Sequence, residues 1–143
     1  MKISKYILFL LSSFIFNQLA FGQKLDRNIY FNFVKADSSE FIKYAQQIGF
    51  TTEYDITSKV LFAKTKGFVF GKPLAETGNA SYVLTLVVST LDKENNKIIL
   101  QNAKPVESKK DTWIDDKYLY IEWDLENPIS KEMWYKVLIY RHK

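Results

Sequence analysis

The residues most often used in catalysis are scarce in this chain. Its only histidine, His142, lies beside the C-terminus, and it contains no cysteine. A Ser-His-Asp triad needs a histidine that is oriented by a buried carboxylate, whereas chain ends are poorly ordered. The lack of cysteine excludes disulfides, thiolate metal sites and cysteine nucleophiles. We therefore predict no catalytic residue, no metal ligand and no cofactor.

Acidic side chains are concentrated late in the chain, where Glu122 and Asp124 have the spacing that puts them on one face of a strand. Glycoside hydrolysis uses two carboxylates that flank the sugar. The sequence shows no cleft around this pair, and we interpret the acids as solvated residues. A small carboxylate-dependent hydrolase on Glu122 and Asp124 remains an alternative.

Aromatic residues make up 16% of the chain and include Tyr118 and Tyr120, which share the predicted strand face with the two acids. Tyrosine provides contact area at a low cost in conformational entropy. One face of an antiparallel sheet is commonly solvated. We therefore predict that Tyr118, Tyr120, Glu122 and Asp124 form an exposed binding patch.

Neither phosphate loops nor nucleic-acid surfaces are indicated. Gly67 and Gly71 frame a segment that lacks the Gly-Lys-Ser/Thr ending of a phosphate loop. The net charge of +4 includes Lys2 and Lys5, and without them 18 basic side chains face 16 acidic ones. Because no basic face stands out, we predict that the protein does not bind nucleic acid.

Residues 1–22 have the three regions of a secretory signal peptide. Lys2 and Lys5 precede an apolar run over 6–16, and the small residues Ala20 and Gly22 form a cleavage site. The run is shorter than the roughly 20 residues that a membrane span takes. We predict cleavage after Gly22 and export to the periplasm or the extracellular space, with no stable membrane span after cleavage.

Residues 23–143 are predicted to form a single α+β domain. Asp37 and Glu40 form a capping box that starts a helix, and Gly49 ends it. Period-two patterns predict strands at 28–34, 59–64, 67–72, 81–91, 97–103, 117–125 and 133–141, with a loop at 104–116. A polar turn at 92–96 predicts that 81–91 and 97–103 pair as a hairpin. The expected fold is one N-terminal helix packed on an antiparallel sheet of about six or seven strands. The predicted core comprises Phe31, Phe41, Ile42, Ala45, Ile48, Leu84, Leu86, Leu119, Ile121 and Trp123.

Three functions follow from these patterns. The first is an exported, non-enzymatic binding protein whose partner is an envelope or extracellular protein or a glycan. The second is a carrier of an apolar ligand in a curled sheet, because 81–91 and 133–141 are apolar on both faces. The third is the hydrolase. A flat aromatic surface would favour the first, a deep closed pocket the second, and a cleft that holds both acids the third.

Overall fold

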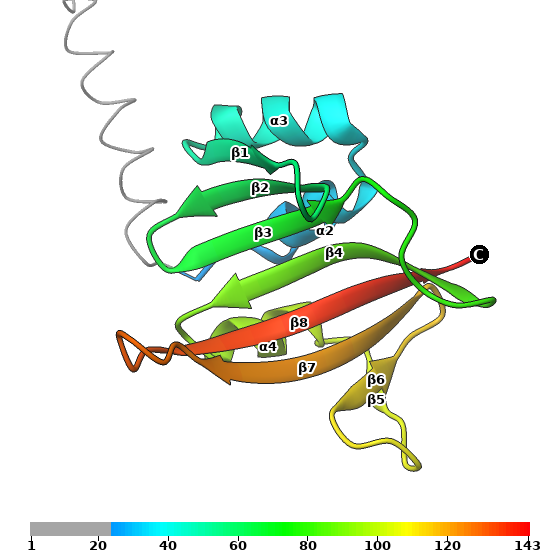
Figure 1. Cartoon of the computed structure of the whole chain (residues 1–143). Helices are drawn as coiled ribbons and strands as arrows, with labels where there is room; N and C mark the ends of the chain where they lie inside the picture. Colours follow the sequence, from blue (N-terminus) through cyan, green and yellow to red (C-terminus); the bar gives the residue numbers. More distant parts are fainter. Residues whose placement is uncertain (1–23) are drawn as a thin grey trace, which may run out of the picture.

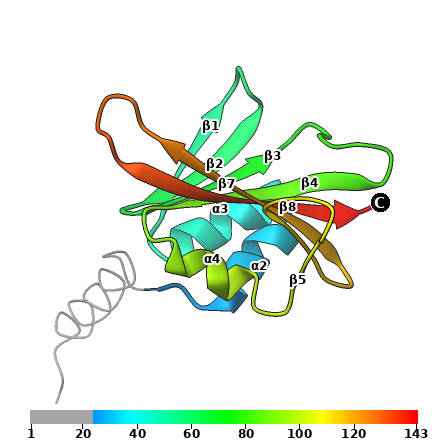
Figure 2. The same ribbon diagram turned by 90° about the horizontal axis from the view of Figure 1, so that it is seen from below.

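The computed structural model describes residues 24–143, so the predicted signal peptide lies outside the described residues. An antiparallel sheet of eight strands carries three described helices on one face (Figures 1 and 2). The elements are α2 (Arg27–Lys35), α3 (Ser38–Gln47), β1 (Thr51–Asp55), β2 (Val60–Thr65), β3 (Phe68–Pro73), β4 (Tyr82–Thr90), α4 (Glu94–Ile99), β5 (Lys104–Pro105), β6 (Thr112–Ile114), β7 (Tyr118–Glu126) and β8 (Met133–His142). The predicted α+β class is confirmed, with more helices and strands than expected. Within residues 24–143, no helix is both long and apolar enough to cross a membrane.

The helix α3 forms where the sequence predicts it. The Asp37 carboxylate accepts a hydrogen bond from the Glu40 N–H at 2.8 Å, and the Glu40 carboxylate accepts one from the Asp37 N–H at 3.0 Å. Gly49 follows the helix with a φ of 86°, a backbone conformation that costs free energy for residues other than glycine. The capping box and the glycine are set by neighbouring residues, which explains why the sequence alone was sufficient to predict this helix.

The predicted strand over 28–34 is wrong, because α2 occupies these residues. The Asp26 side chain accepts from the Asn28 N–H at 2.8 Å and caps the helix. Tyr30, Phe33 and Val34 are its buried residues, at the i, i+3 and i+4 spacing of a helical face. Aromatic residues are dense enough in this segment to satisfy a period of two as well as a period of 3.6.

The predicted strand over 97–103 is also wrong. The chain instead forms α4, which starts within the predicted turn, and just before it the Asp92 carboxylate accepts a hydrogen bond from the Glu94 N–H at 3.0 Å. Ile99, counted as part of a strand, is buried against the sheet from this helix. Three strands were not predicted. Two of them, β5 and β6, lie within the expected loop at 104–116, and the third, β1, follows α3.

The sheet consists of two meanders joined by one long-range pairing. Its strand order is β1-β2-β3-β4-β8-β7-β6-β5. Consecutive strands pair within β1 to β4 and within β5 to β8, and the β4–β8 pairing connects the two halves. A register shift between Leu84 and Leu86 interrupts this central ladder.

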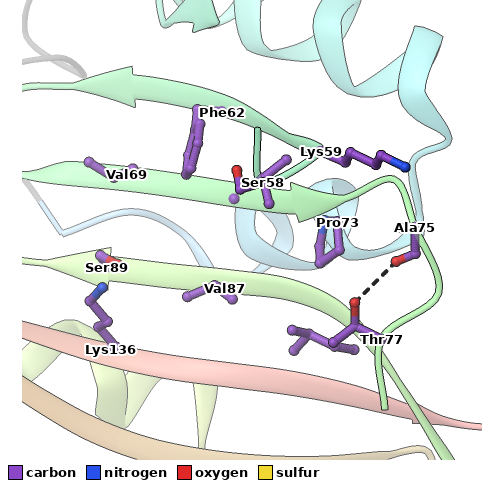
Figure 3. A pocket seen from close by; sticks show the side chains of 13 residues that line it. Ser58, Lys59, Phe62, Val69, Pro73, Ala75, Thr77, Val87, Ser89 and Lys136 are labelled. Carbon is purple, nitrogen blue, oxygen red and sulfur yellow. Dashed lines mark hydrogen bonds between the residues drawn. The ribbon is translucent and has the colours of Figure 1, made fainter. Parts of the chain in front are cut away.

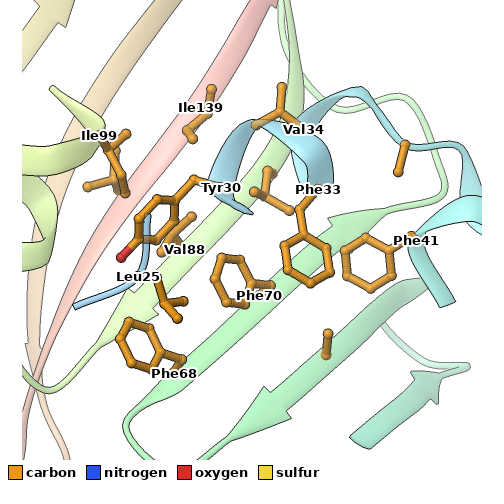
Figure 4. Packing of buried hydrophobic residues seen from close by; sticks show 14 of the residues in the cluster. Leu25, Tyr30, Phe33, Val34, Phe41, Phe68, Phe70, Val88, Ile99 and Ile139 are labelled. Atoms are coloured by element: carbon orange, nitrogen blue, oxygen red, sulfur yellow. The ribbon is translucent and has the colours of Figure 1, made fainter. Parts of the chain in front are cut away.

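The core lies between the helices and the sheet and is rich in aromatic rings (Figure 4). The rings of Phe33 and Phe70 stack with centroids 4.5 Å apart. Both side chains are fully buried, as is Tyr30, whose hydroxyl donates to the Asn95 amide oxygen at 3.2 Å. Of the predicted core, Phe41, Ala45 and Leu86 are buried, Phe31, Ile42, Ile48, Leu84, Leu119 and Ile121 are partly buried, and Trp123 is exposed.

Candidate functional site

The faces of β7 are the reverse of those predicted. Tyr120 is fully buried and Tyr118 is 9% exposed, because both point toward the helices. The Tyr118 ring lies 5.5 Å from that of Phe31 in α2. The Tyr120 hydroxyl donates a hydrogen bond to the Asp115 carboxylate at 2.5 Å. The pKa of Tyr120 is raised, mainly by burial and in addition by this hydrogen bond. The two tyrosines are therefore core residues and do not form the exposed patch that we expected.

Glu122 and Asp124 continue the same face beyond the buried tyrosines. The Asp124 carboxylate lies 3.6 Å from the Lys93 ammonium, just before α4. Glu122 is partly buried, and desolvation raises the pKa of its carboxyl group. A binding role for these two acids stays a prediction, now without the neighbouring tyrosine surface on which it was based.

The opposite side of the sheet, which we call the open face, carries no described helix (Figure 2). One cross-strand row of this face contains Phe62, Gly71, Val87, Leu138 and Ile121, each in register with the next. Gly71 leaves room for the Phe62 ring, since a Cβ atom at this position would lie 3.2 Å from the ring carbon Cε1. The row is an apolar stripe that runs across five strands.

The next row of the open face contains Lys64, Val69, Ser89, Lys136 and Trp123. The Lys64 ammonium forms an ion pair with Glu53 at 2.8 Å. Lys136 is partly buried, and no acidic side chain among residues 24–143 lies within ion-pair distance of it. An unneutralised cation therefore lies in the middle of a largely apolar surface.

A trough is hollowed into the open face. Its first part has a volume of about 310 Å³ and is lined by Phe62, Val69, Val87, Ser89 and Lys136, among others (Figure 3). Loop residues close one end, where the Thr77 hydroxyl donates to the Ala75 carbonyl at 3.2 Å.

The second part of the trough, of about 300 Å³, shares Val69, Ser89 and Lys136 with the first. It continues to Trp134 and to Pro128, in the turn between β7 and β8. The two parts meet at Lys136, so that the trough extends from the turn between β1 and β2 to the β7–β8 hairpin.

Two large apolar side chains of β7 are exposed on the open face, Trp123 at 59% and Leu125 at 47%. Leu125 lines the second part of the trough, and Trp123 extends the apolar surface beyond it. Contiguous exposed apolar surface on a soluble protein commonly marks an interaction site. The arrangement is suited to contact with an apolar partner and offers one cation for charge recognition.

The described chain offers little for catalysis at this surface. No group of three or more His, Cys, Asp or Glu side chains within residues 24–143 is placed to hold a metal ion. His142 is exposed, and its ring lies 4.4 Å from that of Tyr82 at one end of the central β4–β8 pairing. Neither the trough nor its rim therefore brings a nucleophile and a histidine base together.

Comparisons with protein-family models, with curated proteins and with solved structures found no match to this chain. Function must then be inferred from the site itself. Its lining residues were missed as a group by the sequence patterns. The signal that could have found them is the apolar character of both faces of 81–91 and 133–141, which we assigned to a cavity or to a sheet covered on both sides.

Proposed function

We propose that the protein is a non-enzymatic binding protein whose trough holds an apolar segment of a partner protein that carries an acidic side chain. The observation that carries this proposal is the position of Lys136, a partly buried cation without a partner in the described chain, between the two parts of an apolar trough. A charge that loses water on binding is costly unless an opposite charge meets it. A partner with an Asp or Glu opposite Lys136 satisfies this requirement.

The shape of the surface supports an extended macromolecular partner. The trough crosses several strands, Leu125 lines its second part, and the exposed Trp123 extends its apolar surface. Tryptophan is among the residues that contribute most to protein interfaces. If the chain is exported as its first 22 residues predict, the partner is an envelope or extracellular protein.

A carrier of an apolar small molecule is the second candidate, and the 310 Å³ part of the trough supports it. Carrier pockets bury most of the ligand surface, whereas this trough is lined from one face of the sheet and from two loops. The hydrolase has the least support. Its two acids lie on the helix side, and Asp124 is engaged with Lys93.

Selection of displayed random peptides on the purified protein tests the proposal. We expect the selected peptides to combine apolar residues with at least one acid. Lys136→Glu should weaken their binding by at least about tenfold, because an attraction of about 1.4 kcal/mol becomes a repulsion. Lys109→Glu makes the same charge change in an exposed loop and should have no effect.

Binding that survives Lys136→Glu unchanged would overturn the proposal. The carrier alternative has its own measurement, native mass spectrometry of protein purified from its source. A bound small molecule that is lost on Phe62→Ala, with no peptide selected, would establish the carrier instead.

A further inference from the structure

A second cavity, of about 500 Å³, opens where α2 and α3 meet the ends of four strands, β3, β4, β7 and β8. Three of its lining residues are cationic, namely Lys35, Lys72 and Arg141, and a single one, Asp37, is acidic. Its remaining walls are formed by Val34, Ala36, Pro73, Val83, Leu84, Thr85 and Tyr118. This cavity is therefore a positively charged site with an apolar wall.

Lys72 points from β3 toward the helices and is partly buried. Its ammonium donates to the Val34 carbonyl at 3.4 Å, at the C-terminal end of α2. Among residues 24–143, no carboxylate lies within 4.0 Å of this ammonium. Burial lowers the pKa of Lys72, the nearby charge of Arg141 adds to the lowering, and Asp37 and Glu40 oppose it. Two of the three ammonium donors thus remain available for a ligand.

Arg141 approaches the cavity from β8, in register with Val83 on one neighbouring strand and with Tyr118 on the other. Its guanidinium forms no ion pair and no hydrogen bond within the described part of the chain. Tyr118 also lines the cavity, and its hydroxyl has no hydrogen-bond partner among residues 24–143. Arg141 and Tyr118 therefore line the same cavity as Lys72, and the guanidinium and the hydroxyl have no acceptor in the described chain.

The acids near this cavity are used locally. One carboxylate oxygen of Asp37 and one of Glu40 each accept a hydrogen bond from a backbone N–H in the capping box of α3. A capping box satisfies N–H groups that the helix leaves unpaired, so these oxygens are not free to turn toward Lys72. The positive charge of the cavity therefore remains only partly compensated by the protein.

We propose that this cavity binds the oxyanion group of a small molecule, a phosphate or a carboxylate, between Lys72 and Arg141, with the Tyr118 hydroxyl as a third donor. Guanidinium and ammonium groups form charge-assisted hydrogen bonds with such anions. An anion placed there relieves the repulsion between two like charges. The apolar wall formed by Val83 and Leu84 is suited to the rest of the ligand. The cavity shares Pro73 and Leu84 with the trough, but Lys72, Arg141 and Tyr118 do not line the trough, so the proposal does not depend on the function proposed for the trough.

Calorimetric titration of the purified protein with sodium phosphate, and separately with sodium acetate, tests the proposal at constant ionic strength set by sodium chloride. We expect saturable binding of at least one anion and a rise in melting temperature with it. Stronger binding of phosphate would assign a phosphate ligand, and stronger binding of acetate a carboxylate. Lys72→Met and Arg141→Gln should each weaken binding by about tenfold or more, the loss expected for a charge-assisted hydrogen bond.

Lys64→Met is the matched control, because Lys64 lies on the neighbouring strand but faces the open side, where it pairs with Glu53. It should bind the anion as the wild type does. If Lys72 only stabilised the end of α2, Lys72→Met would lower the melting temperature equally with and without the anion. That result, or no saturable binding of either anion, would overturn the proposal, and Arg141→Gln keeps the test valid if Lys72→Met fails to fold.

Discussion

The two faces of the sheet are made from alternate residues of the same strands, yet only one of them is covered. In β3, Phe68 and Phe70 are buried under the helices, whereas Val69 lies in the trough on the open face. Both faces are largely apolar. Hydrophobicity therefore does not decide which face of this sheet is the interior, and the position of the helices does.

The faces differ in how their apolar side chains are packed. On the covered face, Phe33, Phe50 and Phe70 contact one another as rings with centroids 4.5 to 5.9 Å apart. On the open face, the small residues Gly71 and Ser89 and the cation Lys136 interrupt the apolar surface. The first arrangement stabilises the fold, and the second leaves the hollow in which we propose that a partner binds.

The largest expected difference is between two phenylalanines on opposite faces. Phe70→Ala should lower the free energy of unfolding by about 3–5 kcal/mol, since the ring is fully buried. Phe62→Ala should cost only about 1 kcal/mol, because its ring is partly exposed. Urea unfolding of both variants measures the difference. Equal losses would mean that the open face is covered in the folded protein.

A smaller effect is expected at the buried tyrosine that we had predicted to be exposed. Tyr120→Phe removes the hydrogen bond to Asp115 and should cost about 1.5–3 kcal/mol, the usual range for a bond to a charged group. Tyr140→Phe is the matched control on the open side of β8 and should change stability by less than about 0.5 kcal/mol. If Tyr120→Phe were as mild as its control, the assignment of the covered face would be contradicted.

Glu122 provides a pH-dependent comparison. Burial raises the pKa of its carboxyl group in the folded state, so the folded protein binds this proton more tightly than the unfolded chain. The resulting stability is present at low pH and is lost as pH rises from the ordinary glutamate range through the raised pKa.

Glu122→Gln should therefore gain stability relative to the wild type as pH increases through that range. The gain should stay below about 1 kcal/mol, because solvent screens a side chain that is only partly buried. Urea unfolding at a series of pH values measures it. Parallel pH profiles for the two proteins would show that Glu122 is solvated on both sides of the folding transition.

The smallest effect on stability is expected for Trp123→Phe, which should change the free energy of unfolding by less than about 0.5 kcal/mol. The variant is distinguished by its tryptophan fluorescence. Trp123 is exposed, whereas Trp113 and Trp134 are partly buried, so the variant should lose the fluorescence that acrylamide quenches most readily. Unchanged quenching would indicate that another molecule covers the open face.

Several elements were predictable because short segments determine them. The capping box of α3 and the alternation in β2, β3, β4, β7 and β8 needed no distant information. The faces of β7 were not predictable in this way. Alternation places Tyr118 and Tyr120 on one face and Leu119 and Ile121 on the other, and either pair is apolar enough to be buried. We predicted burial of the aliphatic pair, whereas the tyrosines are the buried pair.

The trough could not be assembled from the sequence for a different reason. Lys136 reaches Val69 and Ser89 only because β4 pairs with β8, and we had expected β4 to pair with 97–103. Once that segment is a helix, the strand next to β4 comes from the end of the chain. Errors in a single element therefore propagated to the site.

The β4–β8 pairing also bears on the order of folding. Each meander can form from neighbouring hairpins, whereas joining β4 to β8 closes a long loop and should come late. The trough contains Ser89 from one meander and Trp134 from the other. A molecule bound there would contact both meanders and stabilise the pairing between them. Amide hydrogen exchange should therefore slow more in β4 and β8 than in the other strands when the trough is filled.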